Sequence, residues 1–246
     1  NFLMMENLKI EIYADGADLK QMYELNKMKF IKGFTTNPSL MRKAGVTDYK
    51  KFAVELLSQI KDKPISFEVF SDEIEEMGDQ AREIASWGTN VFVKIPVTNT
   101  KGESTANLVN ELSNKGVNLN ITAIFTLEQL DKILEALNSQ TQAILSVFAG
   151  RIADSGIDPS NIISQSVSKA KVKPKSKILW ASTREIINIY QADNLGCQII
   201  TVPHNLLSKL SNIGKNLEKF SLETVLGFYK DAKSAGYSIN SKKKND

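Results

Sequence analysis

The chain has 246 residues, 42% of them apolar, which is enough to bury the core of one large domain such as an α/β barrel. With 31 Lys and Arg against 28 Asp and Glu, its net charge of +3 is too small and too scattered for a nucleic-acid-binding surface. One cysteine and one histidine exclude an intramolecular disulfide, a cysteine-cluster metal site and a histidine-rich metal site, and they fit a reducing cytoplasm.

The two ends of the chain are set apart from the predicted fold. Residues 1–4 (NFLM), which precede Met5, are expected to be a remnant of expression. Residues 239–246 are expected to be a basic, disordered tail. No run of 18 apolar residues and no cleavable signal pattern occurs, so the sequence predicts a soluble, cytoplasmic protein with no membrane partner. The expected fold is therefore one domain over residues 5–238.

Short runs of β-branched and apolar residues alternate with longer amphipathic stretches along the chain. Strands are predicted at 9–15, 33–37, 65–70, 90–96, 118–124, 143–149, 177–182 and 198–203. Helical segments with apolar spacing near 3.6 lie between them, for example at 48–61 and 126–138. Eight such units without a linker predict a single-domain (β/α)₈ barrel, with an extra C-terminal helix near 221–235 packed outside the last units. A doubly wound open sheet is the alternative, but its Gly-rich phosphate turns are not found.

The fourth predicted strand has one charged residue among apolar ones. Six of the seven residues from Val91 to Val97 are apolar, and the exception is Lys94. Burying an unpaired ammonium is costly, so Lys94 is expected to be accessible, paired or useful as a neutral amine. Side chains alternate between the two faces of a strand, and the other predicted strands also have one apolar and one repeatedly polar face. The apolar face is expected to meet the helices, and the polar face to line the barrel interior.

Polar residues toward the carboxyl ends of the strands predict a catalytic mouth there. Lys94 is expected to share this cavity with Asp15, Asn37, Glu68, Asn120, Thr122, Ser146 and Ser182. By the same alternation Phe148 joins Ser146, and Trp180 fills the barrel below Ser182. The alternative is a satisfied polar network without chemistry, but polar groups on so many strands are a costly way to build a core.

Amine catalysis is the chemistry that best suits this cavity, since the chain offers neither a metal-ligand cluster nor a nucleotide-binding loop. A lysine amine with apolar neighbours and nearby cations can attack a ketone. The Schiff base that forms is an electron sink for carbon–carbon cleavage. Asp15 and Glu68 would supply the proton transfers of carbinolamine dehydration and retro-aldol cleavage. No cofactor and no metal is expected.

A phosphate site is predicted beside the late strands. Arg151 follows the sixth strand, Arg184 follows the seventh, and Ser182 with Thr183 is a candidate helix N-cap. Two guanidiniums, a hydroxyl and a helix N-terminus suit a phosphate, and phosphate sites in this fold commonly lie at these strands. The alternative is a pair of surface arginines in ordinary ion pairs.

These motifs together resemble those of the short transaldolases, over nearly the whole chain from YADGAD to the last helix. The matching motifs occur in family order: FTTNPSL, SFEVF, VFVKIPVT, NLNITAIFT, SVFAGRIAD and ASTRE. The resemblance implies a reversible, cofactor-free transfer of a dihydroxyacetone unit between sugar phosphates. The donor would be fructose 6-phosphate or sedoheptulose 7-phosphate and the acceptor an aldose phosphate, within the pentose phosphate pathway. It also implies that the protein self-associates.

The resemblance implies a role for each matching residue. The lysine at 94 would form the Schiff base, Asp15 would handle the proton of the C4 hydroxyl, and Glu68 with Thr122 would share a catalytic water. The remaining positions would bind the substrate: the dihydroxyacetone unit is held by Asn37 and Asn120, the sugar phosphate by Arg151, Ser182 and Arg184, and the site is completed by Ser146 and Phe148.

Two other functions stay open. Fructose 6-phosphate aldolase shares the lysine and the aspartate, but typically has Gln at the position of Glu68 and Tyr at that of Phe148, so both positions favour the transferase. A catalytically silent sugar-phosphate-binding barrel is the alternative from another class. The family often has Pro at the position of Val147 and an aromatic residue at that of Thr183, and both departures bear on phosphate recognition.

Two further residues call for an interpretation. His204 follows the last strand; it could line the mouth, but a place at the start of a helix beside Asn205 is the favoured interpretation. Cys197, at the amino end of the same strand, is expected to be a buried structural thiol.

Overall fold

The computed structural model describes residues 5–239 and shows a closed, eight-stranded parallel barrel. The strands are β1 (Glu11–Asp15), β2 (Ile31–Thr35), β3 (Ile65–Glu68), β4 (Val91–Pro96), β5 (Leu119–Ile124), β6 (Ala143–Val147), β7 (Ser176–Trp180) and β8 (Ile199–Pro203). The ring closes because β8 pairs with β1 in parallel, from Glu11 opposite Ile199 to Asp15 opposite Pro203. The predicted (β/α)₈ barrel is confirmed.

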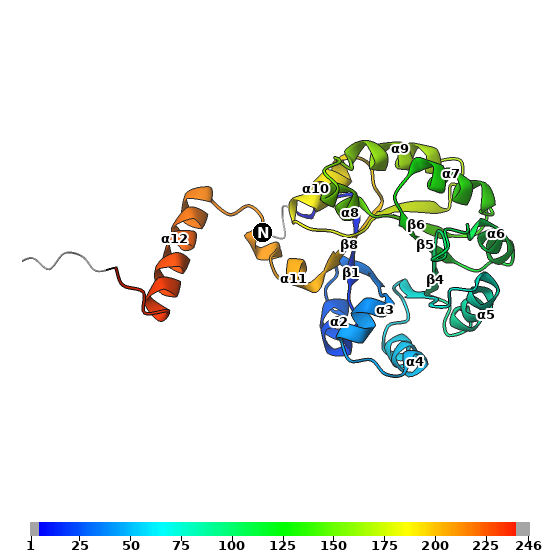
Figure 1. Ribbon diagram of the computed structural model, residues 1–246, viewed down its shortest axis with the longest axis horizontal. Helices are drawn as coiled ribbons and strands as arrows, with labels where there is room; N and C mark the ends of the chain where they lie inside the picture. The colour runs from blue at the N-terminus through cyan, green and yellow to red at the C-terminus, as the bar shows by residue number, and fades with distance from the viewer. Residues whose placement is uncertain (1–4, 240–246) are drawn as a thin grey trace, which may run out of the picture. The chain divides into compact units, whose positions relative to one another are not determined.

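Helices surround the ring of strands (Figure 1). The first half of the barrel carries α2 (Leu19–Asn26), α3 (Pro38–Lys43), α4 (Tyr49–Gln59), α5 (Ile74–Ala85) and α6 (Ala106–Asn114). The second half carries α7 (Leu127–Ala136), α8 (Ala149–Asp154), α9 (Ser160–Ala170), α10 (Ile187–Asn194) and α11 (His204–Leu207). The short helices α3, α8 and α11 each follow a strand directly, so they lie at the carboxyl end of the barrel.

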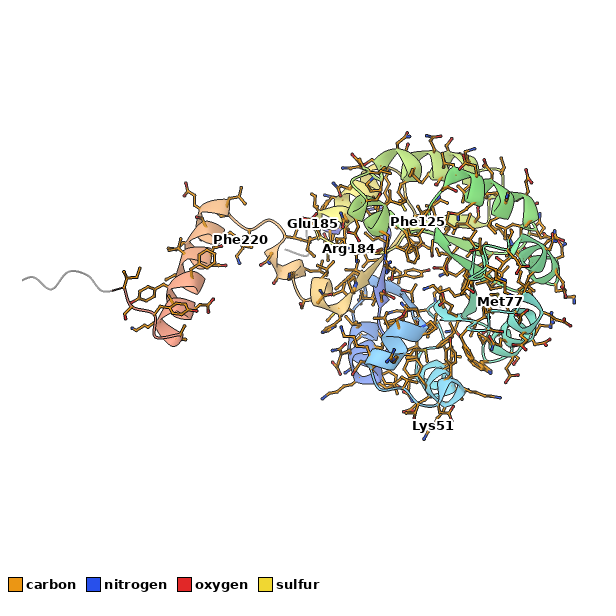
Figure 2. The ribbon with its side chains drawn as sticks, viewed as in Figure 1. Lys51, Met77, Phe125, Arg184, Glu185 and Phe220 are labelled. Atoms are coloured by element: carbon orange, nitrogen blue, oxygen red, sulfur yellow. The ribbon has the colours of Figure 1, made fainter. Side chains whose placement is uncertain are left out.

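The outer helices are amphipathic, and local signals fix where they begin. Thr126 is the N-cap of α7 and forms a capping box with Gln129. The Thr126 side chain accepts from the backbone N–H of Gln129, and the Gln129 side chain accepts from the backbone N–H of Thr126. Met77 lies on the face of α5 that meets the strands, whereas Lys51 extends outward from α4 (Figure 2). The apolar faces of these helices therefore form an outer core layer against the barrel.

The barrel interior has its own apolar cluster, composed of Tyr13, Phe92, Ile144, Leu179, Ala181 and Ile199. Leu179 and Ala181 thus face inward on β7 and after it, and Trp180 faces the helices, where it lines a cavity with residues of α8 and α10. The prediction that Trp180 fills the barrel is wrong. That prediction assumes that side chains alternate regularly up to Ser182, but Ser182 has a φ of 61°, and this left-handed turn interrupts the alternation.

The described chain divides into two compact units, one of which is the barrel at residues 7–210. The other includes the helix α12 (Leu217–Ser234), which begins at the N-cap Asn216 and has no buried residue. It matches the helix predicted near 221–235; its packing outside the barrel and the single domain at 5–238 stay predictions. The proposed remnant at 1–4 and the tail from residue 240 lie outside the described residues. Among those described, no helix is both long and apolar enough to cross a membrane.

Candidate active site

Lys94 lies inside the barrel, on β4 between two polar neighbours. Its Cα pairs with that of Glu68 on β3 and with that of Asn120 on β5. The side chain is buried, and Nζ donates one hydrogen bond, of 3.1 Å, to the backbone carbonyl of Thr36. Among the described residues no carboxylate forms an ion pair with this amine, so Nζ is not committed to a charged partner.

Asp15 ends β1 and belongs to a chain of buried hydroxyls. Thr35 Oγ1 lies 2.8 Å from Asp15 Oδ1, to which it donates, and 2.5 Å from Thr201 Oγ1. Burial raises the pKa of Asp15, while the charge of Lys94 and the Thr35 hydrogen bond oppose that rise. The carboxyl is therefore oriented by a hydroxyl and disposed to take up a proton.

Glu68 is a second carboxyl with a raised pKa. Burial is the main cause, the charge of Lys94 opposes it, and the charge of Asp15 adds to it. Two carboxyls and one amine thus influence one another inside the barrel, as groups that act together in acid–base catalysis must. The three side chains come from β1, β3 and β4, at the carboxyl end of each strand or near it.

A buried amide joins hydroxyls on two other strands. Asn120 Nδ2 donates to Ser66 Oγ at 3.0 Å, and Ser146 Oγ donates to Asn120 Oδ1 at 2.7 Å. These bonds fix the orientation of the amide. Thr122 Oγ1, also buried on β5, has no hydrogen-bond partner among the described residues, so its hydroxyl is available to water or substrate.

Asn37 has a structural task at the start of α3. Its side-chain oxygen accepts a 2.9 Å hydrogen bond from the backbone N–H of Leu40, as an N-cap does. The same N-cap role leaves the amide Nδ2 with two protons to donate. Asn37 can therefore hold the helix and still bind a ligand hydroxyl or carbonyl.

The two arginines lie beyond β6 and β7. Arg184 stands next to Glu185 in the loop after β7 (Figure 2), and its Nη2 pairs with Asp154 Oδ2 at 2.5 Å. Asp154 is the last residue of α8, the helix that contains Arg151. The pKa of Asp154 is lowered first by the Arg184 hydrogen bond and further by the charges of both arginines. One carboxylate thus pairs with Arg184 and also feels the charge of Arg151.

The backbone between these arginines is tightly packed. A Cβ on Gly150 would lie 1.5 Å from the carbonyl oxygen of Ser182, so only glycine fits there. The predicted N-cap at Ser182 and Thr183 is wrong: α10 begins at Ile187, and Thr183 Oγ1 donates to the carbonyl of Thr201 instead. The backbone N–H groups of Arg184 and Glu185 donate to the Asn188 side chain.

Comparison with known proteins decides the family. A profile described as Transaldolase/Fructose-6-phosphate aldolase matches residues 12–243. The chain belongs to this enzyme family. A probable transaldolase of Thermoanaerobacter sp. is 37% identical over 202 residues, covering 82% of this chain and 89% of that protein. A probable transaldolase of Dehalococcoides mccartyi is 34% identical over 202 residues, covering 82% and 90%.

Solved structures agree with the barrel. An orotidine 5'-monophosphate decarboxylase from Metallosphaera sedula aligns with a TM-score of 0.52 over 85% of this chain and 98% of that one. At 13% identity this likeness concerns the fold alone. The transaldolase/fructose-6-phosphate aldolase family is therefore supported by sequence, and the barrel by shape.

For a member of this family, the predicted residues fall into two groups. The first group lies in the barrel interior. There the charges of Lys94, Asp15 and Glu68 act on one another, and Asn120 is hydrogen-bonded to Ser146. Phe148 is the N-cap residue of α8; it packs against the interior cluster and stacks on Phe125 with ring centroids 5.8 Å apart. The second group, from β6 and β7 onward, contains the arginines.

Sequence reasoning missed the hydroxyls that orient this family member's interior. Thr35 bonds Asp15, Thr201 bonds Thr35, and Ser66 bonds Asn120. None of the three is among the predicted site residues. A signal existed, because each is a polar residue at an inward position of an otherwise apolar strand. Their partners could not be inferred, since Thr35 and Thr201 are 166 residues apart.

Two residues outside this group match their interpretations. His204 is the first residue of α11 and is exposed, as expected for a helix start. Cys197 is buried, and burial raises the pKa of its thiol to about 12. In the described part of the chain, no three His, Cys, Asp or Glu side chains form a group able to hold a metal ion.

Proposed function

We propose that this protein is a transaldolase that moves a dihydroxyacetone unit between sugar phosphates through a Schiff base on Lys94. The observation that carries the proposal is a buried lysine amine whose one hydrogen bond within the described residues goes to a carbonyl, and whose charge acts on two carboxyls of raised pKa. This combination fits amine catalysis better than a stabilising network, because a network would pair the ammonium with a carboxylate. The relatives named probable transaldolase support it.

The covalent step begins at the donor ketone. Lys94 Nζ attacks C2 of fructose 6-phosphate or sedoheptulose 7-phosphate, and the carbonyl oxygen becomes the hydroxyl of a carbinolamine. Loss of that hydroxyl as water, after protonation, leaves an iminium. Glu68 and Thr122 are the groups proposed to deliver this proton, through a water held between the free Thr122 hydroxyl and the carboxyl.

Carbon–carbon cleavage follows. Asp15 accepts the proton of the C4 hydroxyl, the C3–C4 bond breaks, and its electron pair moves into the iminium to give an enamine. The leaving aldose phosphate departs, and an acceptor aldehyde takes its place. The enamine carbon attacks that aldehyde, Asp15 returns its proton, and hydrolysis releases the new ketose from Lys94. Atoms and charge balance without an oxidant, a metal or an organic cofactor.

Substrate binding is assigned to the remaining residues. Asn37 and Asn120 would hold the dihydroxyacetone hydroxyls, with Ser146 fixing the Asn120 amide. Arg151, Ser182 and Arg184 would hold the phosphate, and Asp154 keeps Arg184 in a defined rotamer. The proposed setting is the non-oxidative pentose phosphate pathway in the cytoplasm, with a self-associated protein.

Transfer is favoured over aldol release by two side chains. Phe148 lacks a hydroxyl that could protonate the enamine, and Glu68 replaces the glutamine typical of the aldolase. The enamine therefore persists until an acceptor arrives. The deciding assay supplies fructose 6-phosphate with and without erythrose 4-phosphate. We expect sedoheptulose 7-phosphate with the acceptor, and no free dihydroxyacetone without it.

Each alternative gives a different result in this assay. Free dihydroxyacetone without an acceptor would make the protein an aldolase. Thermal stabilisation by fructose 6-phosphate without turnover would make it a silent binder. Phe148→Tyr is the matched variant: it keeps the ring and adds the hydroxyl, so it should increase dihydroxyacetone release at the expense of transfer.

A further inference from the structure

A cavity opens at the amino end of the barrel, and Lys94 is not part of its lining. It has a volume of about 290 Å³ and is lined by residues at or just before the starts of β1, β3, β4, β6 and β7. Its apolar walls are Pro64, Phe92, Ile144 and Pro174. This end of a barrel normally serves stability, and interior positions there are filled with branched apolar side chains. The polar groups in this cavity need another explanation.

Tyr13 is a buried residue among these polar groups. The residue is 2% exposed, and its hydroxyl has no hydrogen bond to any described residue. Burial, with the charge of Glu11, raises the pKa of Tyr13, so the hydroxyl keeps its proton and can donate. The ring lies against Gly33, where a Cβ would come within 2.6 Å of it. A phenylalanine would fill the same space without an unpaired hydroxyl.

Two lysines, Lys175 and Lys177, line the cavity, and both belong to a lysine-rich segment. Five lysines occupy alternate positions from 169 to 177, and no acidic residue lies among them. Lys169 pairs with Asp131, Lys173 donates to the Leu137 carbonyl, and Lys177 pairs with Glu11 at 2.7 Å. Lys175 lines the cavity and has neither an ion pair nor a hydrogen bond from its amine within the described chain. Two lysines against one glutamate leave an excess positive charge at the cavity.

The remaining lining groups suit hydroxyls rather than a purely apolar ligand. The Gln142 side chain at the rim has no hydrogen bond within the described residues, and it can both donate and accept. Glu11 can accept from a ligand hydroxyl as well as from Lys177. Phe92 and the two prolines offer flat apolar faces to C–H groups. The cavity volume is near the lower end for ligand pockets, which limits the ligand to a small one.

We propose that this cavity is a second binding site, for a small polyhydroxylated organic anion. The anionic group, a phosphate ester or a carboxylate, binds Lys175 with support from Lys177. The hydroxyls bond Gln142, Glu11 and the Tyr13 hydroxyl, and the carbon chain lies against Phe92. The site is separate from the Lys94 cavity, and the proposal holds whether or not transaldolase activity is found.

The test is calorimetric titration of the full chain carrying Arg151→Ala and Arg184→Ala, which removes the cationic groups of the proposed phosphate site. The probes are glycerol 3-phosphate, glycerate and inorganic phosphate. We expect one site per chain for at least one of the two polyol anions, tighter than for inorganic phosphate. Which of the two binds tells whether the anionic group is a phosphate ester or a carboxylate.

Three further substitutions in that background assign the site. Lys175→Ala should weaken binding about tenfold, the loss expected for one charge-assisted hydrogen bond. Tyr13→Phe should also weaken binding, while leaving the melting temperature close to that of its parent, because the hydroxyl it removes makes no hydrogen bond to a described residue. Lys171→Ala is the matched control, since Lys171 is exposed in the same segment, without a partner in the described chain and outside the cavity lining. It should bind like its parent.

Several results would overturn the proposal. Absence of binding by both polyol anions in the arginine-free background would do so. Equal affinities in the Lys175, Tyr13 and Lys171 variants would show that the anion binds elsewhere. Inorganic phosphate binding as tightly as glycerol 3-phosphate would show that the polyol groups of the site contribute nothing.

Discussion

The two ends of the barrel interior are built from the same strands and differ in chemistry. At the carboxyl end, Asp15, Lys94 and Asn120 are inward residues linked to hydroxyls and carbonyls. Two residues earlier on β1 and β4, the inward positions are Tyr13 and Phe92 of the apolar cluster. Because side chains alternate along a strand, Tyr13 faces the same way as Asp15, and Phe92 faces the same way as Lys94. The inward face of each strand therefore changes from apolar to polar toward its carboxyl end.

The two layers are therefore expected to serve different purposes: the amino-end layer stabilises the fold, and the carboxyl-end layer carries the proposed chemistry. The amino-end layer buries apolar area and contributes stability. The carboxyl-end layer buries two carboxyls and an ammonium, and both carboxyls have raised pKa values because their ionised forms are disfavoured there. Substitutions in the two layers should therefore affect different quantities.

The largest effect is expected for Lys94→Met. Methionine keeps much of the volume and removes the amine, so turnover should fall by several orders of magnitude, to background, while the melting temperature stays the same or rises. Steady-state kinetics and thermal denaturation on the same preparation check this. A variant with full turnover and no lysine at 94 would contradict the mechanism.

The opposite pattern is expected in the apolar layer. Ile199→Ala removes a fully buried side chain and should lower the free energy of unfolding by about 2–5 kcal/mol, with turnover retained well below the melting temperature. Ile199→Val is the graded control, at about 0.5–1.5 kcal/mol. Loss of turnover in a folded Ile199→Val variant would show that the two layers are not separable.

The fold could largely be predicted from the sequence, because it depends on local patterns. Strand periodicity and helix spacing predict all eight βα units correctly, and the motif around Lys94 predicts an active site at the carboxyl end of the strands. The predicted helix near 221–235 begins four residues after α12 does, because the prediction overlooks the N-cap residue Asn216. These patterns arise within about ten residues and need no tertiary information.

What could not be predicted depends on contacts between distant segments. The pairing of Thr35 with Thr201, and of Arg184 with Asp154, joins residues on different βα units. The error at Trp180 has a backbone cause, because no residue type announces the left-handed Ser182 that Gly150 approaches. The sequence thus suffices to propose reactive groups, and it does not reveal the distant residues that bond them.

A smaller effect is expected for the Asn120 amide. Asn120→Ala leaves the buried hydroxyls of Ser66 and Ser146 without this partner, which should cost about 1–3 kcal/mol of unfolding free energy. It should also raise KM for the donor more than it lowers kcat. Ser66→Ala removes only one of the two bonds and serves as the partial control in denaturant titrations. Equal stability losses for the two variants would mean that the Ser146 bond contributes nothing.

The smallest effect is a pH dependence at Glu68. Because the folded-state pKa of Glu68 is raised, the folded protein binds its proton more tightly than the unfolded chain. This contribution to stability is present below the unfolded pKa and is lost as pH rises through the folded one. Glu68→Gln does not titrate, so its melting temperature relative to the parent protein should increase between pH 4 and pH 8. A difference that is constant or falls would contradict the raised pKa.

The Schiff base itself is tested most directly by trapping it. The protein is mixed with fructose 6-phosphate and borohydride, its intact mass is measured, and the labelled peptide is mapped. We expect a reduced three-carbon adduct on Lys94 and an unmodified Lys94→Met variant. An unmodified parent protein beside a labelled, substrate-competent positive control, or an adduct on another lysine, would contradict the assignment of Lys94 as the nucleophile.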